Sequence, residues 1–366
     1  MERKLFQRIK NVIIMKKCLQ FFLMSLVLFG CNSSPKNQVT LNADILDKAS
    51  VLKADSVSIS GIDVSRAKEL YVYADSILIA RNYERDGNHL IEMYNLNTKK
   101  LINKIFGIGH GQGEVLLSDV TISYNTMFVR DYQQQKSCTV NLDSAISDTN
   151  YTPQLQKIQN RGISKVAIFK GKEIVENSYA FEDEKSGIHQ PGKKLLTAEE
   201  YDKEKGKSHK YDVMNVASNG LIIISPNDDR IFYANTNQSF LEMYDSNLNR
   251  TMTITGPKDM QTDYQAYREE NEVLPKKYIP YAYADFYCSK EDFGLIYYGV
   301  SVDANNYDFE KKNAYLFVFD WNGNMKKSIN LKCHVKAISK SKHYKDSYYI
   351  CTYGEGGNLK IYRLHE

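Results

Sequence analysis

Cysteine and histidine side chains near the C-terminus are the residues of this chain whose types could bind a metal ion. Cys333 and His334 are adjacent, and His343 and Cys351 follow in the next part of the sequence. Thiolate and imidazole groups are ligands that zinc prefers, but structural zinc sites place them at short repeated spacings such as Cys-x-x-Cys. These four residues lack such a spacing. We therefore predict cysteines buried in strands and no metal site.

Oxygen ligands occur together in one short segment, Asp303-Ala304-Asn305-Asn306-Tyr307-Asp308. Its carboxylate and amide oxygens suit calcium, but it lacks the turn glycine and the terminal glutamate of an EF-hand loop. We interpret it as a polar turn. His110 and His189 stand alone in loop-like sequence, and the chain has neither a Gly-x-Ser-x-Gly nor a His-Glu-x-x-His motif. The sequence therefore predicts no catalytic residue, no metal and no cofactor.

A different kind of chemistry is indicated at Cys31. Lys16 and Lys17 precede an apolar run, Cys18–Gly30, and Cys31 follows directly. Two positively charged residues, a short apolar segment and a small residue before the cleavage site are typical of a secretory signal peptide. The run has 13 residues, whereas a membrane-spanning helix needs about 20. We therefore predict a signal peptide over residues 1–30 and not a transmembrane helix.

The end of this signal, Leu28-Phe29-Gly30-Cys31, resembles a bacterial lipoprotein lipobox, from which Phe29 departs at one position. The resemblance implies diacylglycerol on the Cys31 thiol, cleavage after Gly30 and acylation of the new N-terminus, commonly with palmitate. We expect an outer-membrane lipoprotein, attached to the membrane through this lipid, because Asn32 does not suggest inner-membrane retention. The leaflet that it faces and the start codon, Met1 or Met15, stay open.

Removal of the signal changes the charge balance. The whole chain has 48 Lys and Arg and 44 Asp and Glu, and residues 1–30 hold six of the basic and one of the acidic residues. The mature chain therefore has 42 basic and 43 acidic residues. Such a balance gives no basic surface for nucleic acid. We expect no nucleic-acid partner.

The mature chain is predicted to be all-β. After a polar tether, residues 31–42, short runs of Ile, Val, Tyr and Phe alternate with Asn, Asp, Gly and Lys. Runs of this length and composition are typical of strands. Examples are Ser76–Ala80, Thr126–Arg130, Lys165–Phe169, Leu221–Ser225, Gly294–Tyr298 and Ser347–Cys351.

A repeated hairpin makes this prediction more specific. Three segments end a strand in an aromatic residue and Asp or Asn, make a tight turn and begin another strand; they start at Leu90, Leu241 and Leu316. Asp and Asn suit the turn because their side chains bond the local backbone. Hairpins repeated over some 300 residues are typical of a β-propeller. At roughly 40–50 residues a blade, residues 43–366 predict about six four-stranded blades, closed by a strand from residues 40–60 pairing with Leu359–Leu364.

Two segments resemble the TolB-like six-bladed propeller lipoproteins of Gram-negative envelopes. Phe106–Glu114 is similar to a glycine-rich segment of that family, with Gln112 where Pro is usual, and Asn227–Ala234 is similar to a later Asp-x-x-Arg segment that leads into a Tyr-Ala strand. The resemblance implies the fold and the envelope location and no activity. Glu114-Val115 follows the glycines where a phosphate loop needs Lys and Ser or Thr, so we predict a turn between blades.

Two segments interrupt the strand pattern. Residues 182–212 form a charged insertion in which Thr197 and Glu200 have the spacing of a capping box, which predicts a short exposed helix. Residues 258–273 suggest a second such helix, before Pro275. Insertions of this kind often build binding faces of propellers, but a solvated excursion without a partner is equally compatible with the sequence.

The sequence favours a binding or scaffolding module for a protein partner at one face or at the channel mouth. The alternative is a glycan-binding protein, or a glycan-active lyase or hydrolase that uses the channel. Tyrosines crowd residues 278–298 and could contact either ligand, although we expect most of them to pack between sheets. The binding residues, any catalysis, the oligomeric state and the pairing of Cys138, Cys288, Cys333 and Cys351 stay open.

Overall fold

The structure, a computed structural model, describes residues 37–85, 88–158, 166–176, 180–181, 188–189, 195–205, 220–260, 264–267, 272–275, 278–303 and 309–366. The predicted signal peptide and the lipidation site Cys31 lie outside the described residues. Within these ranges, every helix is too short or too polar to span a membrane.

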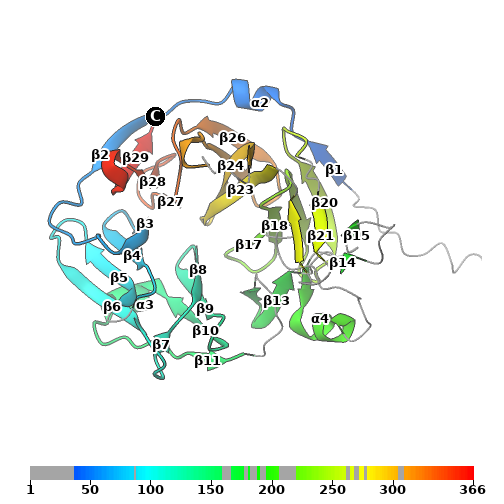
Figure 1. The fold of residues 1–366 in the computed structure, drawn as a ribbon. Helices are drawn as coiled ribbons and strands as arrows, with labels where there is room; N and C mark the ends of the chain where they lie inside the picture. Colours follow the sequence, from blue (N-terminus) through cyan, green and yellow to red (C-terminus); the bar gives the residue numbers. More distant parts are fainter. Residues whose placement is uncertain are drawn as a thin grey trace, which may run out of the picture. The chain divides into compact units, whose positions relative to one another are not determined.

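Six mainly antiparallel sheets, or blades, follow one another around a ring in the described part of the chain (Figure 1). The prediction of an all-β, six-bladed propeller is therefore confirmed. Blade one contains β3 (Ala67–Tyr73), β4 (Ile77–Asn82), β5 (His89–Asn95), β6 (Leu101–Ile108) and β7 (Glu114–Val115); blade two β8 (Ser118–Ser123), β9 (Thr126–Asp131), β10 (Lys136–Asn141) and β11 (Gln156–Lys157); blade three β12 (Val166–Phe169), β13 (Lys172–Glu176) and β16 (Leu195–Thr197).

The remaining three blades include both N-terminal strands. Blade four contains β17 (Gly220–Ile224), β18 (Ile231–Asn235), β19 (Phe240–Tyr244), β20 (Arg250–Thr255) and β1 (Asn37–Thr40); blade five β23 (Tyr278–Cys288), β24 (Asp292–Asp303), β25 (Tyr315–Asp320) and β26 (Met325–Asn330); blade six β27 (Ala337–Lys340), β28 (Tyr348–Tyr353), β29 (Leu359–His365) and β2 (Lys53–Val57).

Successive residues in several strands are all apolar because both faces of a blade are buried. Successive side chains of a strand point to opposite faces of its sheet. In β4, Ile77 and Ile79 pack with residues of blade two, whereas Leu78 and Ala80 pack with residues of blade six. Apolar clusters also join blades three and four, four and five, and five and six, so much of the core lies between the blades.

The repeated hairpins share one geometry. The strand pairs β5–β6, β19–β20 and β25–β26 each have an irregularity at the same place, before the turn. Asn95, Asp245 and Asp320 each accept two backbone N–H bonds from the turn at 2.9 Å through Oδ1. The side chains predicted to shape these turns therefore do so.

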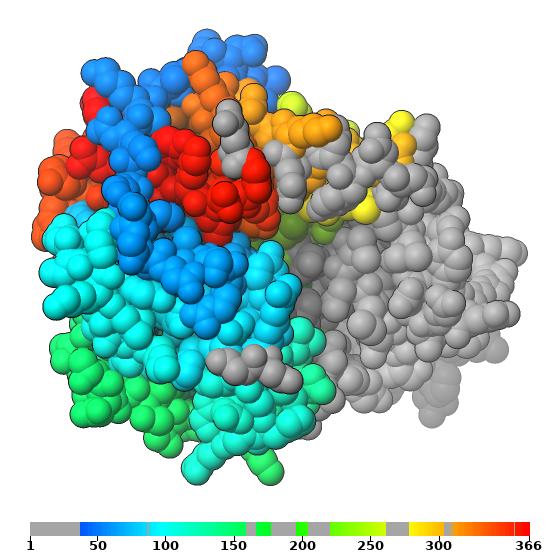
Figure 2. Space-filling view, turned by 60° about the vertical axis from the view of Figure 1, so that its left-hand side comes forward, coloured from blue at the N-terminus to red at the C-terminus, as the bar shows by residue number. Residues whose placement is uncertain are grey.

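An N-terminal strand closes the ring. β2 pairs with β29 in antiparallel register, with Asp55 opposite Arg363. In Figure 2 these N-terminal residues (blue) lie against the C-terminal strand (red). The predicted closure is confirmed, and it covers the sheet edge that β29 would otherwise expose.

The segment before β2 also crosses the preceding two blades, and we call residues 38–57 the N-terminal strap. Leu41 N–H donates to Thr255 O in blade four at 2.9 Å, and Ser50 N–H donates to Ser328 O in blade five at 2.9 Å. The short helix α2 (Asp44–Asp47) lies between these contacts. Residues 38–42, predicted as part of a tether, thus belong to the strap, while residues 31–36 lie outside the described residues.

The two insertions differ in outcome. In the first, α4 (Ala198–Lys205) begins with the predicted capping box: Thr197 N–H donates to Glu200 Oε2 at 2.8 Å, and Glu200 N–H donates to Thr197 Oγ1 at 3.2 Å. The helix suggested over residues 258–273 is wrong, because β21 (Tyr264–Tyr267) and β22 (Glu272–Pro275) form a hairpin there. Backbone pairing between these two segments takes precedence over a weak local helical preference.

Candidate functional site

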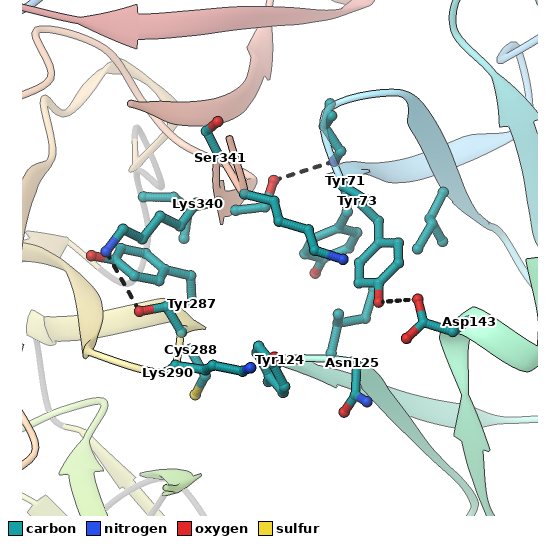
Figure 3. A pocket seen from close by; sticks show the side chains of 18 of the residues that line it. Tyr71, Tyr73, Tyr124, Asn125, Asp143, Tyr287, Cys288, Lys290, Lys340 and Ser341 are labelled. Atoms are coloured by element: carbon teal, nitrogen blue, oxygen red, sulfur yellow. Dashed lines mark hydrogen bonds between the residues drawn. The ribbon is translucent and has the colours of Figure 1, made fainter. Parts of the chain in front are cut away.

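The central channel ends in a cavity of about 300 Å³, which we call the polar cavity. Four blades line it, through β3, the β8–β9 turn, the end of β23 and β27 (Figure 3). Its lining includes Asn125, four tyrosines, three lysines and two carboxylates: Tyr71, Tyr73, Tyr124, Tyr287, Lys290, Lys340, Lys342, Asp143 and Glu291.

Hydrogen bonds fix several of these side chains. Tyr73 Oη donates to Asp143 Oδ1 at 2.7 Å, as Figure 3 shows. Lys340 Nζ donates to both carboxylate oxygens of Asp292, at 2.7 and 2.8 Å. Burial by itself raises the pKa of Asp292, but the hydrogen bonds from Lys340 and Ser289 outweigh burial and lower it. Lys340 is therefore a neutralised part of the wall.

The other two lysines of the polar cavity differ from Lys340. Among the residues that the structure describes, no carboxylate forms an ion pair with Lys290 or Lys342. Figure 3 shows the Lys290 ammonium extending toward Tyr124. Asp143 and Glu291 bring two negative formal charges to the same lining, so the cavity carries charges of both signs.

A second cavity, of about 310 Å³, adjoins the first. Tyr124 and Asn125 line both cavities. The second cavity extends toward blades three and four, and Asp228 is the one charged residue among the described residues that line it. Its lining combines hydroxyl-bearing side chains, among them Thr121, Thr139 and Ser225, with apolar side chains from β9, β12, β17, the turn after β17 and β23: Phe128, Val166, Ile168, Leu221, Ile222, Ile224, Pro226 and Phe286.

Deeper in the channel, two carboxylates lie near each other. Glu69 accepts hydrogen bonds from Tyr71 Oη at 3.2 Å and from Arg81 Nη1 at 3.0 Å. Asp285 accepts one from Ile338 N–H at 3.0 Å. Burial raises the pKa of Asp285 to about 8, and the negative charge of Glu69 contributes to the rise. Asp285 is therefore predominantly neutral at pH 7, and we assign this pair a structural role.

The candidate zinc ligands do not converge. His334 Nδ1 lies 2.9 Å from Tyr298 Oη, and burial raises the pKa of the Cys351 thiol to about 12. Neutral thiols are poor metal ligands. The four cysteines that the structure describes, Cys138, Cys288, Cys333 and Cys351, are all free thiols. In the described residues, no group of three or more His, Cys, Asp or Glu side chains could hold a metal ion.

The glycine-rich segment forms a turn, as predicted, but the turn lies within blade one, between β6 and β7, and not between blades. β6 and β7 pair in parallel around it, and Glu114 accepts the Gly111 N–H at 2.7 Å. A Cβ atom at Gly109 would lie 2.3 Å from Glu114 Oε2. The glycines therefore make room for a carboxylate of the same chain rather than for a phosphate.

Among the other sequence candidates, His110 lines neither cavity. His110 is exposed in the glycine turn. The side chain of His189 and residues 304–308 of the polar turn lie outside the described part of the chain. In the tyrosine-rich region Tyr283, Tyr297 and Tyr298 are buried, as expected for packing, whereas Tyr287 reaches the polar cavity.

Sequence reasoning did not identify Tyr73, Tyr124, Lys290 or Lys342 as site residues. All four lie at the ends of channel-facing strands or in the turns that follow them. A blade-by-blade alignment of these turns could have grouped them, because equivalent turns of a propeller meet at the same end of the channel.

Comparison with known proteins identifies the fold. The family model of TolB-like 6-blade propeller-like proteins matches residues 70–342. A solved structure described as an exported protein from Bacteroides fragilis NCTC 9343 is 12% identical, covers 90% of this chain and 98% of its own, and has a TM-score of 0.50. A member of the DUF4221 family from Bacteroides vulgatus ATCC 8482 is 9% identical over 87% and 97%, with a TM-score of 0.48. The search of curated proteins finds no match.

Proposed function

Because the chain belongs to the TolB-like six-bladed propeller family, in which the fold alone does not define a function, we propose from its site that it is a binding module. Its ligand is a segment of a protein partner, held at the channel mouth. The observation that carries this proposal is the pair of cavities that share Tyr124 and Asn125, each lined by polar and by apolar side chains. A protein segment offers both kinds of side chain within a few residues.

A glycan ligand is the second candidate, and the four tyrosines of the polar cavity favour it. Tyrosine combines an apolar ring with a polar hydroxyl group. The second cavity favours a protein ligand, because aliphatic side chains such as Ile224 and Leu221 complement apolar side chains better than hydroxylated sugar rings. For this reason we place protein binding first.

We further propose that the mature protein is anchored in the cell envelope through a lipid on Cys31, with the outer membrane as its location. Asn37, where β1 begins, is the sixth residue after Cys31. An extended chain of that length reaches about 20 Å. Lipidation would thus keep the propeller close to the bilayer surface.

Retention of a partner from envelope extract tests the binding proposal. The mature protein is immobilised and compared with Tyr124→Ala, which alters both cavities, and with Tyr278→Ala as the matched control. Tyr278 is 48% exposed and lies at the opposite end of β23 from Tyr287. We expect a protein that the wild type and the control retain and Tyr124→Ala loses.

An activity screen on glycans accompanies the retention experiment. Turnover that disappears in Asp285→Asn or Glu69→Gln would overturn the proposal in favour of an enzyme. Equal retention of every protein by the wild type and Tyr124→Ala would remove the channel mouth as the binding site.

A further inference from the structure

We infer that methionine side chains between blades four and five form an oxidation site, at which a peroxide converts the Met252 thioether to a sulfoxide and loosens the contact between the two blades. The inference goes beyond the proposed function and does not depend on it. We call the apolar contact between these blades the seam. Its cluster contains Phe232 and Ile254 of blade four and Phe293 and Phe319 of blade five.

The cysteines are poor targets for a peroxide. A thiol reacts as its thiolate, so a thiol with a raised pKa reacts slowly. Burial raises the pKa of all four cysteine thiols in the described ranges, to about 12 for Cys288 and Cys351. A methionine sulfur needs no deprotonation before it is oxidised. Oxidation is therefore expected at methionine rather than at these cysteines.

The methionines that solvent reaches are gathered at the seam. The described ranges hold six methionines, of which three are buried: Met93, Met127 and Met260. The other three are partly exposed, and all of them pack against the seam cluster: Met243, Met252 and Met325. Exposure and location thus select the same three residues, which we call the seam methionines.

Met252 joins the two blades. Met243 and Met252 are directly opposite each other in β19 and β20, so their side chains share one face of blade four. Gly323 lies in the turn between β25 and β26 of blade five, and a Cβ atom there would be 3.0 Å from Met252 Sδ. The Met252 sulfur therefore rests against the backbone of the neighbouring blade, at a place where only a glycine leaves room.

The tryptophan of the same turn reports on the seam. Trp321 is the single tryptophan of the chain. Its ring centroid lies 5.0 Å from that of Phe293 in blade five and 6.1 Å from that of Phe232 in blade four. Its Nε1–H donates to Ser289 O at 3.2 Å. A change in the packing of the two blades should therefore change the emission of this one residue.

The chemistry of oxidation explains why the contact loosens. A lone pair of the Met252 sulfur attacks one oxygen of hydrogen peroxide, an S–O bond forms, the O–O bond breaks and the second oxygen leaves as water. The sulfur loses two electrons and the peroxide gains them. The sulfoxide is polar, and burial of a polar group without a hydrogen bond is unfavourable. Because Ile254 and the seam cluster surround Met252, its oxidised side chain should leave the seam.

Peptide mapping by mass spectrometry tests the site. The mature protein is treated with hydrogen peroxide for increasing times and then digested. We expect the seam methionines to be oxidised roughly tenfold faster than Met93 and Met127, because reaction follows exposure. Oxidation of all of these residues at one rate would overturn the assignment of a site.

Two variants test the role of Met252. Met252→Leu removes the oxidisable sulfur and keeps an apolar side chain of similar volume. Peroxide should lower the melting temperature of the wild type by a few degrees and shift the Trp321 emission to longer wavelength, whereas Met252→Leu should show neither change. The matched control is Met243→Leu, which keeps the sulfur that touches Gly323 and should respond as the wild type does.

The outcomes are separate from those of the retention experiment, since no partner is needed. An equal peroxide response in the wild type and Met252→Leu would overturn the role of Met252. A response that Met243→Leu also loses would overturn the assignment to the Met252–Gly323 contact. Neither result would change the proposed binding function, which depends on Tyr124.

Discussion

Tyr73 donates its phenolic hydrogen to Asp143 at 2.7 Å and so joins the end of β3 in blade one to α3 (Leu142–Ser147) beside blade two. This bond crosses the boundary between two blades at the wall of the polar cavity. It links the Tyr73 ring to a carboxylate beside the neighbouring blade. The wall of the polar cavity thus depends on a bond between blades.

Removing that hydroxyl should change the cavity more than the stability. Tyr73→Phe loses one hydrogen bond to an exposed carboxylate, so we expect the free energy of unfolding to fall by about 1 kcal/mol or less. Retention of the envelope partner should weaken, because the Tyr73 ring in the wall of the polar cavity loses the bond that fixes it. Urea denaturation and the retention experiment measure the two effects. Unchanged retention would show that the Tyr73–Asp143 bond does not shape the binding site.

The buried carboxyl of Asp285 predicts a pH effect. Its pKa is raised to about 8 in the folded protein, whereas an unfolded Asp titrates near pH 4. Between these values the folded state binds a proton that the unfolded state lacks, so this group lowers stability progressively as pH rises from about 4 to 8. The neutral variant Asp285→Asn should remove this loss.

Thermal unfolding from pH 5 to 8.5 measures the Asp285 effect. The melting temperature of Asp285→Asn minus that of the wild type should increase with pH, because contributions common to both proteins cancel. Glu69, Arg81 and the N–H groups of Ile338 and Phe286 face this carboxyl and are unchanged in the variant. A difference that is constant with pH would contradict the assignment.

The glycine turn predicts a coupling between Gly109 and Glu114. Gly109→Ala places a methyl group against Glu114 Oε2, so the carboxylate must move and lose the Gly111 N–H. We expect a loss of about 1–2 kcal/mol in the free energy of unfolding. In a Glu114→Ala background the same substitution should cost clearly less. Additive losses in this double-mutant cycle would exclude the proposed contact.

Ring closure predicts the effect of shortening the mature chain. A chain that begins at residue 58 lacks the N-terminal strap, and β29 becomes an exposed edge strand. We expect a lower melting temperature and concentration-dependent association, measured by calorimetry and analytical ultracentrifugation. The control is the mature chain that begins at residue 32. A monomeric short chain with an unchanged melting temperature would show that β2 does not contribute to closure.

The lipobox predicts the effect of Cys31→Ser. The variant should lack the thiol that receives diacylglycerol, remain uncleaved and take up no fatty-acid label. Metabolic labelling with an alkyne fatty acid, followed by membrane fractionation, measures both properties. Cys138→Ser is the matched control and should be labelled as wild type. Label retained by Cys31→Ser would refute the lipidation site.

The sequence by itself determined the strands, the turns and the repeated hairpin. The side chains of Asn95, Asp245 and Asp320 bond backbone groups within a few residues of themselves, and Ile77–Ala80 is apolar on both faces because both faces are buried. Such signals are local, so they are readable without a structure. The exception was residues 258–273, where pairing between β21 and β22 stabilises strands instead of the expected helix.

Only the tertiary structure decided the candidate site. Tyr73, Tyr124, Lys290 and Lys342 come from blades one, two, five and six, and they meet because the ring closes through β2 and β29. Whether a lysine is neutralised depends on its neighbours: the ammonium group of Lys340 binds Asp292, whereas that of Lys342, two residues later, forms no ion pair among the described residues. Charge compensation acts over a few ångströms in space, and spacing along the chain does not encode that distance.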